Sequence, residues 1–331
     1  MQPWINALVG IDEAGLGPLL GPMTVGYSVF ELAQAISADA LMNLDLWKQL
    51  GGAVARKPAK TRRKPVVCDS KVIYSPSKGV KPLEEEVLAW AHHAGIDTSS
   101  LDGLLAGLCP LAREKRQHYR WYEAATAGFP LECEAGLAPL RVKPIAEALG
   151  KGGCALRALG VVPVFEGEFN RTIRQTDNKA RAEFDVIGRI LAHLWVKHRH
   201  VGVICDRQGG RAHYRHALHE QFAEADITVF LETPKVSTYE LCVTSEPDQP
   251  RMFIAFVEKG DGKHFPVALA SMCAKYVREL MMHRMNEYFA GHQPGLRPTA
   301  GYYGDGQRFL QDTDELRKRL GIDDGLFIRA R

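Results

Sequence analysis

Residues 11–22 read Ile11-Asp12-Glu13-Ala14-Gly15-Leu16-Gly17-Pro18-Leu19-Leu20-Gly21-Pro22 and place two adjacent carboxylates at the end of an apolar run, residues 7–11. The run predicts a buried strand, and the glycines and prolines after it predict a sharp turn. Two carboxylates at the end of a buried strand are costly to ionise unless a positive charge lies nearby. A divalent metal ion is the simplest such charge, because Mg²⁺ prefers carboxylate oxygens.

The composition is typical of a globular protein with one large or two smaller domains. The chain has 331 residues, of which 46% are hydrophobic and 24% charged. It has no apolar run as long as a membrane helix needs, and its N-terminus lacks a secretory signal, so we expect no membrane association and a cytoplasmic location. Seven cysteines without a Cys-x-x-Cys pair argue against a zinc site and a disulfide framework.

Two basic segments stand out against a net charge of only +3. The first, residues 51–64, contains Arg56, Lys57, Lys60, Arg62, Arg63 and Lys64. The second, residues 113–122, interleaves cations with Tyr119, Trp121 and Tyr122. Basic clusters with aromatics suit a nucleic-acid backbone and stacking on bases. For each segment alone, we favour the simpler interpretation of a solvated loop and an amphipathic helix face.

The order of predicted elements indicates an α/β fold with a mixed sheet flanked by helices. We expect strands at residues 7–12, 24–30, 161–165, 200–206, 228–231 and 252–257, and helices at residues 31–50, 83–94, 180–197 and 266–289. Residues 95–160 show no clear repeat and predict a mainly helical insertion or small subdomain of unknown role. The catalytic domain would then comprise residues 1–94 and 161–331.

Two more acids lie where a metal site could use them. Asp206 ends the predicted strand at residues 200–206, directly before a glycine-rich turn, although a turn aspartate or helix N-cap is the simpler interpretation. Glu279 shares a helix face with Ser271 and Lys275, because the three are spaced i, i+4 and i+8. The simpler interpretation there is a surface ion pair between Lys275 and Glu279.

The sequence resembles the type 2 ribonuclease H family, that is, ribonucleases HII and HIII. Five motifs occur in the family's order over roughly residues 6–30, 66–90 and 165–310. They are Asp12-Glu13-Ala14-Gly15, Asp69-Ser70-Lys71, Phe169-Asn170, the stretch from Lys259-Gly260-Asp261-Gly262-Lys263 to Glu279, and Gly301-Tyr302-Tyr303-Gly304. Residues 95–160 have no counterpart in the family.

The resemblance implies a ribonuclease H-like fold and a metal-dependent endoribonuclease. Its metal and catalytic residues would be Asp12, Glu13, Asp206 and Glu279, with Asp261 or Glu258 as replacements for Glu279 if the alignment is shifted. Two Mg²⁺ or Mn²⁺ ions, about 4 Å apart, would activate a water and stabilise the leaving 3′-oxygen. The substrate would be the RNA strand of an RNA/DNA hybrid or a ribonucleotide embedded in duplex DNA.

The resemblance also implies residues that bind the substrate. These are Gly15, Leu16, Gly17, Ser70, Lys71, Asn170, Lys263, Tyr302 and Tyr303. The two lysines would contact phosphates, and either tyrosine would stack on the sugar at the cleavage position, unless the tyrosines are core aromatics. The family reads the ribose 2′-hydroxyl with a Gly-Arg-Gly or Gly-Lys-Gly loop. Leu16 departs from this pattern and removes a positive charge.

Glu279, where most type 2 enzymes have Asp, points toward the ribonuclease HIII branch. That branch usually has an N-terminal substrate-binding domain, whereas this chain begins almost directly at the catalytic motif. We therefore expect the domain to be absent, with residues 51–64 and 113–122 as candidates to replace its grip on the duplex. We expect a monomer.

Two other functions remain open from the sequence. One is a nucleic-acid-binding protein that keeps the fold without turnover, although several buried carboxylates would then serve no purpose. The other is a structure-specific DNA nuclease, which would suit the loss of charge at Leu16. A small-molecule phosphotransferase is disfavoured, because the glycine loop lacks a Gly-Lys-Ser/Thr sequence and its prolines remove backbone donors.

Overall fold

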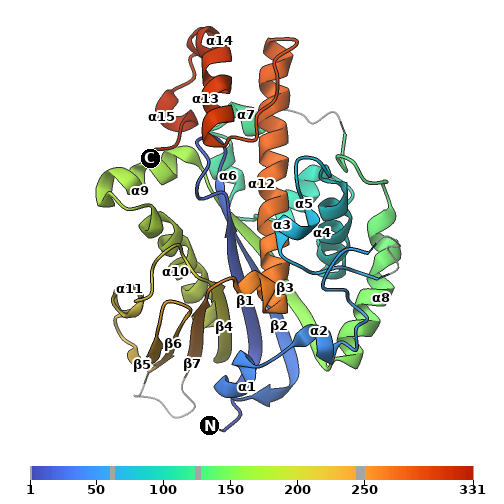
Figure 1. Cartoon of the computed structure of the whole chain (residues 1–331), viewed down its shortest axis with the longest axis vertical. Helices are drawn as coiled ribbons and strands as arrows, with labels where there is room; N and C mark the ends of the chain where they lie inside the picture. The colour runs from blue at the N-terminus through green and yellow to red at the C-terminus, as the bar shows by residue number, and fades with distance from the viewer. Residues whose placement is uncertain (1, 60–63, 124–127, 244–249, 331) are drawn as a thin grey trace.

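The computed structural model describes residues 2–59, 64–123, 128–243 and 250–330, and these residues contain a seven-stranded sheet (Figure 1). The strand order is β3-β2-β1-β4-β7-β6-β5. The strands are β1 (Ile5–Ala14), β2 (Met23–Ile36), β3 (Cys154–Val164), β4 (His200–Asp206), β5 (Asp226–Glu232), β6 (Val236–Cys242) and β7 (Arg251–Val257).

The sheet is mixed, as the sequence predicted. Strands β1, β2 and β3 form an antiparallel meander, β4 lies parallel to β1, and β7 lies parallel to β4. Strands β6 and β5 then continue antiparallel to the edge. This arrangement agrees with the expected ribonuclease H-like sheet flanked by helices. It also places the carboxyl ends of the central strands β1 and β4 side by side, and functional side chains of α/β proteins gather at such strand ends.

Helices cover both faces of the sheet. One face packs against α12 (Phe265–His292), α4 (Lys81–His93) and α8 (Leu137–Lys151), and the other against α9 (Glu166–Thr176), α10 (Lys179–Lys197) and α11 (Arg215–Gln221). The remaining helices are short: α1 (Ala38–Met42), α2 (Leu46–Gln49), α3 (Ser70–Ile73), α5 (Leu101–Leu108), α6 (Arg113–Arg116), α7 (Arg120–Glu123), the 3₁₀ helix η1 (Gly260–Gly262), α13 (Tyr303–Asp312), α14 (Asp314–Leu320) and α15 (Asp324–Phe327). Among the described helices, none is apolar over a length that would cross a bilayer.

The helix predicted over residues 31–50 is wrong in its first part. Strand β2 continues to Ile36, and only the short helices α1 and α2 follow it. The reason is strand pairing: Leu32 pairs with Cys154 of β3, and Ile36 pairs with Ile5 of β1. Leu32 is spaced for a helix in the sequence, but cross-strand partners far along the chain decide its conformation.

Residues 95–160 are mainly helical, with α5 to α8 as their helices, but they do not form a separate core. Leu104, Tyr122 and Leu149 are buried in the same cluster as Phe265 and Met272 of α12. Strand β3 begins inside this segment and pairs with β2 along its length. The helices therefore extend the layer that covers the sheet.

Helix α12 lies directly on the backbone of the neighbouring strands β1 and β2. A Cβ at Gly10 would lie 2.1 Å from the carbonyl carbon of Pro266, and one at Gly26 would lie 2.2 Å from the carbonyl oxygen of Ala270. Polar side chains of β2 use the same proximity, since Ser28 Oγ donates to the Pro266 carbonyl at 2.8 Å. The small residues are therefore required for the helix to approach so closely.

We expect Gly26→Ala to lower the free energy of unfolding by about 2 kcal/mol or more, because its methyl group would meet the backbone of α12 and force the helix off the sheet. Gly291→Ala is the control, because Gly291 lies in α12 itself and a Cβ there would meet only open space. This substitution should leave the free energy of unfolding unchanged or raise it slightly. Urea unfolding of both variants measures the difference. Equal stabilities would contradict the close contact.

Candidate metal centre

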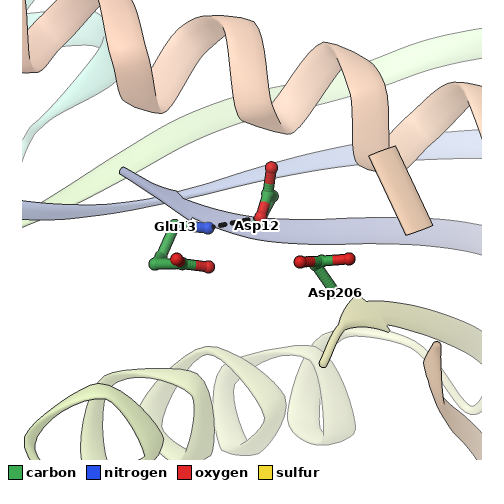
Figure 2. A group of neighbouring side chains, drawn as sticks. All are labelled: Asp12, Glu13 and Asp206. Atoms are coloured by element: carbon green, nitrogen blue, oxygen red, sulfur yellow. Dashed lines mark hydrogen bonds between the residues drawn. The ribbon is translucent and has the colours of Figure 1, made fainter. Parts of the chain in front are cut away.

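Asp12, Glu13 and Asp206 meet at the carboxyl ends of β1 and β4 (Figure 2). One carboxylate oxygen from each lies within 4.8 Å of the others. The register explains the meeting: Ile11 pairs with Cys205 in the parallel ladder, so the next residue of each strand reaches the same level. The chain thus brings together three of its four predicted ligands through one strand pairing.

The three carboxylates approach from different sides of the strand end. Figure 2 shows Asp12 pointing toward α12, while Glu13 points to the opposite side of β1, as successive strand residues do. The backbone N–H of Glu13 donates to Asp12 Oδ1 at 2.8 Å, and the N–H of Gly260 donates to Asp206 Oδ1 at 2.6 Å. The hydroxyl of Ser271 also favours the ionised form of Asp12.

Burial and mutual repulsion oppose ionisation of this group. Burial raises the pKa of Asp12 well above its usual value, and the charges of Glu13 and Asp206 raise it further. Burial, with the charges of Glu183 and Asp206, raises the pKa of Glu13 from 4.5 to about 8. Burial also raises the pKa of Asp206. In the protein alone, Glu13 therefore holds its proton near neutral pH, and a bound cation would favour the loss of this proton.

The donor set fits a hard divalent cation. All three groups offer carboxylate oxygens, which Mg²⁺ and Mn²⁺ prefer, and none of the three offers sulfur or imidazole. A cation would also remove the repulsion that raises their pKa values. The cluster is a candidate metal site on the chemistry of its own side chains.

Asp261 borders this centre from η1. It is buried, and its charge raises the pKa of Asp12. Burial and the charges of Asp69 and Asp206 raise the pKa of Asp261 itself to about 6. Lys71 of α3 is the nearby cation, since its charge lowers the pKa values of both Asp206 and Asp261. Asp69, Asp261 and Lys71 therefore lie close to the three central carboxylates.

Glu279 is not grouped with the three carboxylates in the described structure. Its carboxylate forms an ion pair with Lys275 at 2.5 Å and accepts a hydrogen bond from the hydroxyl of Tyr74 at 2.7 Å. The ammonium of Lys275 also lies 4.5 Å from the ring centre of Tyr74. The i, i+4 pairing that was the simpler interpretation of Lys275 and Glu279 is thus present.

The other predicted substrate residues are divided between the site and the scaffold. Ser70 is buried and its Oγ lies 3.1 Å from the Oγ of Ser271, which places it one side chain from Asp12. Lys263 donates to the carbonyl of Glu258 at 2.6 Å. Asn170 holds the C-terminal segment: its amide donates to the Gly325 and Ile328 carbonyls and accepts from the N–H of Ala330.

Buried arginines hold residues 15–22, which contain Gly15, Leu16 and Gly17 and are called the glycine loop below. Arg329, near the C-terminus, donates to the carbonyl oxygens of Gly15 and Leu16. Arg278 of α12 donates to the carbonyls of Pro22 and Leu20 at 2.6 and 3.1 Å. Gly15 has φ +86°, and a Cβ there would lie 2.6 Å from the Arg278 side chain. The loop conformation therefore requires glycine at position 15.

Tyr302 and Tyr303 are exposed, at 54% and 44%. They follow Gly301, whose carbonyl accepts from the N–H groups of Leu19 and Leu20 in the glycine loop. The alternative that both tyrosines are core aromatics is therefore wrong. Both rings are accessible beside the loop that the resemblance assigns to substrate.

The aromatic residues of the segment 113–122 cannot stack on bases. Tyr119, Trp121 and Tyr122 are buried at 6%, 3% and 0% exposure. Lys115 is paired with Glu168 at 2.7 Å, so part of the positive charge is also neutralised. The structure supports the simpler interpretation of an amphipathic segment whose apolar side joins the core.

The segment 51–64 is described only in part, because Lys60, Arg62 and Arg63 lie outside the described residues. Arg56 donates to the carbonyl of Gly262 at 2.9 Å, and its guanidinium lies 4.3 Å from the ring centre of Trp47. Arg56 thus ties its segment to η1, close to Asp261.

Three residues near the site had no sequence signal strong enough to single them out. Glu183 lies within a helical pattern of α10 that predicts an ordinary amphipathic helix. Tyr74 and Arg329 come from a loop and the C-terminus, and only tertiary contacts bring them to Glu279 and the glycine loop. The spacing of an acid inside an apolar helix face is the one clue that could have indicated Glu183.

The raised pKa of Glu13 predicts a pH-dependent stability. The folded protein binds this proton up to about pH 8 and the unfolded chain only up to about pH 4.5, so stability is lost as the pH rises between these values. In EDTA, the free energy of unfolding should be lower at pH 9 than at pH 6. Glu13→Gln should reduce this loss by on the order of 2 kcal/mol. Urea unfolding at both pH values measures it, and an unchanged pH dependence would contradict the burial of this charge.

No protein-family model and no curated protein matches the sequence. A structure of the PCNA–RNase HII complex from Archaeoglobus fulgidus is similar, with 15% identity, a TM-score of 0.43, and coverage of 98% of this chain and 94% of that chain. Ribonuclease H2 from Pyrococcus horikoshii OT3 has 14% identity and a TM-score of 0.37, with 97% and 92% coverage. Bst-RNase HIII in complex with Mn²⁺ has 12% identity and a TM-score of 0.39, with 99% and 67% coverage. The chain is similar in structure to type 2 ribonucleases H, at a level that carries no functional assignment by itself.

Proposed function

We propose that this protein is a metal-dependent endoribonuclease that hydrolyses the RNA strand of RNA/DNA hybrids or cleaves at ribonucleotides embedded in duplex DNA. The observation that carries the proposal is the meeting of Asp12, Glu13 and Asp206 within 4.8 Å at the ends of two parallel strands. Asp12 and Glu13 begin the first of the motifs by which the sequence resembles type 2 ribonucleases H, and Asp206 ends the strand beside it.

Asp12, Glu13 and Asp206 would hold Mg²⁺ or Mn²⁺. Such ions, when bound, supply an activated water and electrostatic stabilisation of the oxygens at the scissile phosphate. The protein contributes fixed ligand positions: the Gly260 N–H fixes Asp206 and Ser271 supports the ionised form of Asp12. Asp12 is buried and Glu13 and Asp206 are partly buried, which limits the access of solvent to these carboxylates.

Asp261 is the fourth carboxylate in our proposal. The resemblance gave this place first to Glu279, with Asp261 as one of two replacements. The charge of Asp261 acts on Asp12, and the charge of Asp206 acts on Asp261. Glu279 instead forms a cluster with Tyr74 and Lys275. We assign that cluster to the substrate side of the site.

The substrate would lie across the glycine loop and the exposed tyrosines. The charge of Lys71 acts on Asp206 and Asp261, and Lys71 would contact a phosphate beside them. The loop of Gly15, Leu16 and Gly17 would read the ribose through its backbone, while Tyr302 offers an exposed ring for stacking on the sugar. The buried guanidinium of Arg329 lies against this loop, although it comes from a different part of the chain than the arginine or lysine of the family pattern.

A DNA nuclease of the same fold is the second candidate, favoured by the uncharged Leu16 in the ribose-reading loop. The two functions differ in whether a 2′-hydroxyl is needed at the cleaved position. A nucleic-acid-binding protein without turnover differs from both, since it would bind a duplex and cleave none. One set of substrates therefore separates the three.

We expect cleavage of an RNA/DNA hybrid or of DNA with one ribonucleotide, but not of plain DNA, in Mg²⁺ or Mn²⁺. Asp206→Asn should reduce the rate by about 10³-fold or more, because it removes a carboxylate from the centre. Glu224→Gln, which neutralises an exposed acid, is the control and should leave the rate unchanged. Cleavage of plain DNA at the same rate would favour the second candidate.

We also expect Asp261→Asn to weaken Mn²⁺ binding by at least 10-fold, while Glu279→Gln leaves it within about 2-fold and raises the KM for the duplex. Calorimetric titration of Mn²⁺ without nucleic acid gives the first measurement, and steady-state kinetics give the second. The reverse result would return Glu279 to the metal site.

A further inference from the structure

Glu183 is a buried carboxylate that borders the metal centre from α10. It is 1% exposed, although it belongs to a helix whose other buried residues, such as Ile187 and Leu191, pack against the sheet. Its charge is the largest electrostatic influence on Glu13, the carboxylate that points away from α12. Glu183 therefore lies on the side of the centre that α12 and its Ser271 do not reach.

Several buried polar atoms around Glu183 have no hydrogen-bond partner among the described residues. Glu183 Oε2 is buried without a hydrogen-bond partner, and no ion pair involves Glu183 among the described residues. Gln208, two residues after Asp206, is 1% exposed and lies close enough to Glu183 to lower the pKa of this carboxyl, but no hydrogen bond of good geometry forms at its Oε1 or Nε2. The charge of Arg211 lowers the pKa of Glu183, and the buried Nη1 of Arg211 also has no hydrogen-bond partner, while its guanidinium lies 5.5 Å from the ring centre of Phe184.

Such a set of unpaired polar atoms is unusual inside a protein. The large majority of buried polar side-chain atoms have a partner, which is a protein group or an ordered water. A carboxylate oxygen and an amide oxygen accept hydrogen bonds from water, and Mg²⁺ in proteins usually keeps several of its water ligands. Outer groups that bind the ligands of a metal commonly change its affinity by about 10–100-fold.

We propose that Glu183 and Gln208 form an outer shell of the metal centre, in which Glu183 Oε2 and the Gln208 amide bind water ligands of a divalent cation held by Asp12, Glu13 and Asp206. The inference rests on the proposed function, since it requires that these three carboxylates bind a cation. Glu183 acts here as a positioning residue and as an additional negative charge. It makes the centre more negative than the carboxylates of Asp12, Glu13, Asp206 and Asp261 alone.

A purely structural role for Glu183 leads to a different expectation. A carboxylate that stabilises the fold would make the protein less stable when replaced by the neutral glutamine. A carboxylate that serves a cation is a liability in the metal-free protein, because burial and the charges of Asp12 and Asp206 oppose its ionisation. Stability in EDTA and metal affinity therefore separate the two roles without any measurement of activity.

The experiment is a calorimetric titration of Mn²⁺ at pH 7.5 into the full chain, without nucleic acid. We expect Glu183→Gln to weaken binding by about 10–100-fold and Gln208→Ala to weaken it by a smaller factor. Asp185→Asn is the matched control, because Asp185 lies on the same helix and pairs with Arg181 at 2.7 Å. Urea unfolding in EDTA should show Glu183→Gln to be at least as stable as the unchanged protein.

Hexaamminecobalt(III) adds a probe for outer contacts alone, since its ammonia ligands do not exchange for carboxylates. We expect it to compete with Mn²⁺ in the unchanged protein and to compete less well in Glu183→Gln. If the unchanged protein binds no Mn²⁺, the proposed function fails. If it binds Mn²⁺ and both variants bind equally tightly, or if Glu183→Gln is less stable in EDTA, the outer-shell inference is overturned while the proposed function stands.

Discussion

The backbone contact between α12 and the strands β1 and β2 is the constraint on which the rest of the structure depends. Gly10 and Gly26 have no Cβ, so the helix lies against the strand backbone at Pro266 and Ala270. This position brings Ser271 to Asp12. A helix held farther out by side chains would leave the end of β1 open on that side.

The close packing around the end of β1 also forces several carboxylates together, where they repel one another. Carboxylates from β1, β4, η1 and α10 are brought into one buried region, and each opposes ionisation of the others. In the protein alone, this repulsion is relieved by bound protons, at a cost in stability that grows with pH. A divalent cation would relieve it at neutral pH. The arrangement is costly for folding alone, which is why it indicates a site.

The glycine loop shows how distant parts of the chain complete one surface. Arg329 from the C-terminus and Arg278 from α12 both donate to its carbonyl oxygens, and Asn170 holds the C-terminal segment in place. Leu16 lacks the charge that the family pattern has at this position. The buried guanidinium of Arg329 donates to the Leu16 carbonyl, so the loop is held in place although the Leu16 side chain is apolar.

The sequence by itself determined the mixed α/β sheet and the place of Asp12, Glu13 and Asp206 at strand ends, because an acid after an apolar run is a local signal of a strand end. The meeting of these three acids depends on the parallel pairing of β1 and β4. Tertiary structure alone decided the extension of β2 to Ile36, since that strand is fixed by partners far along the chain. It alone also placed Glu279 in an ion pair and brought Glu183 to the centre. Helical spacing predicts on which side of a helix a residue lies, but not which residues that side contacts. Only the packing of α10 and α12 on the sheet determines the neighbours of Glu183 and Glu279.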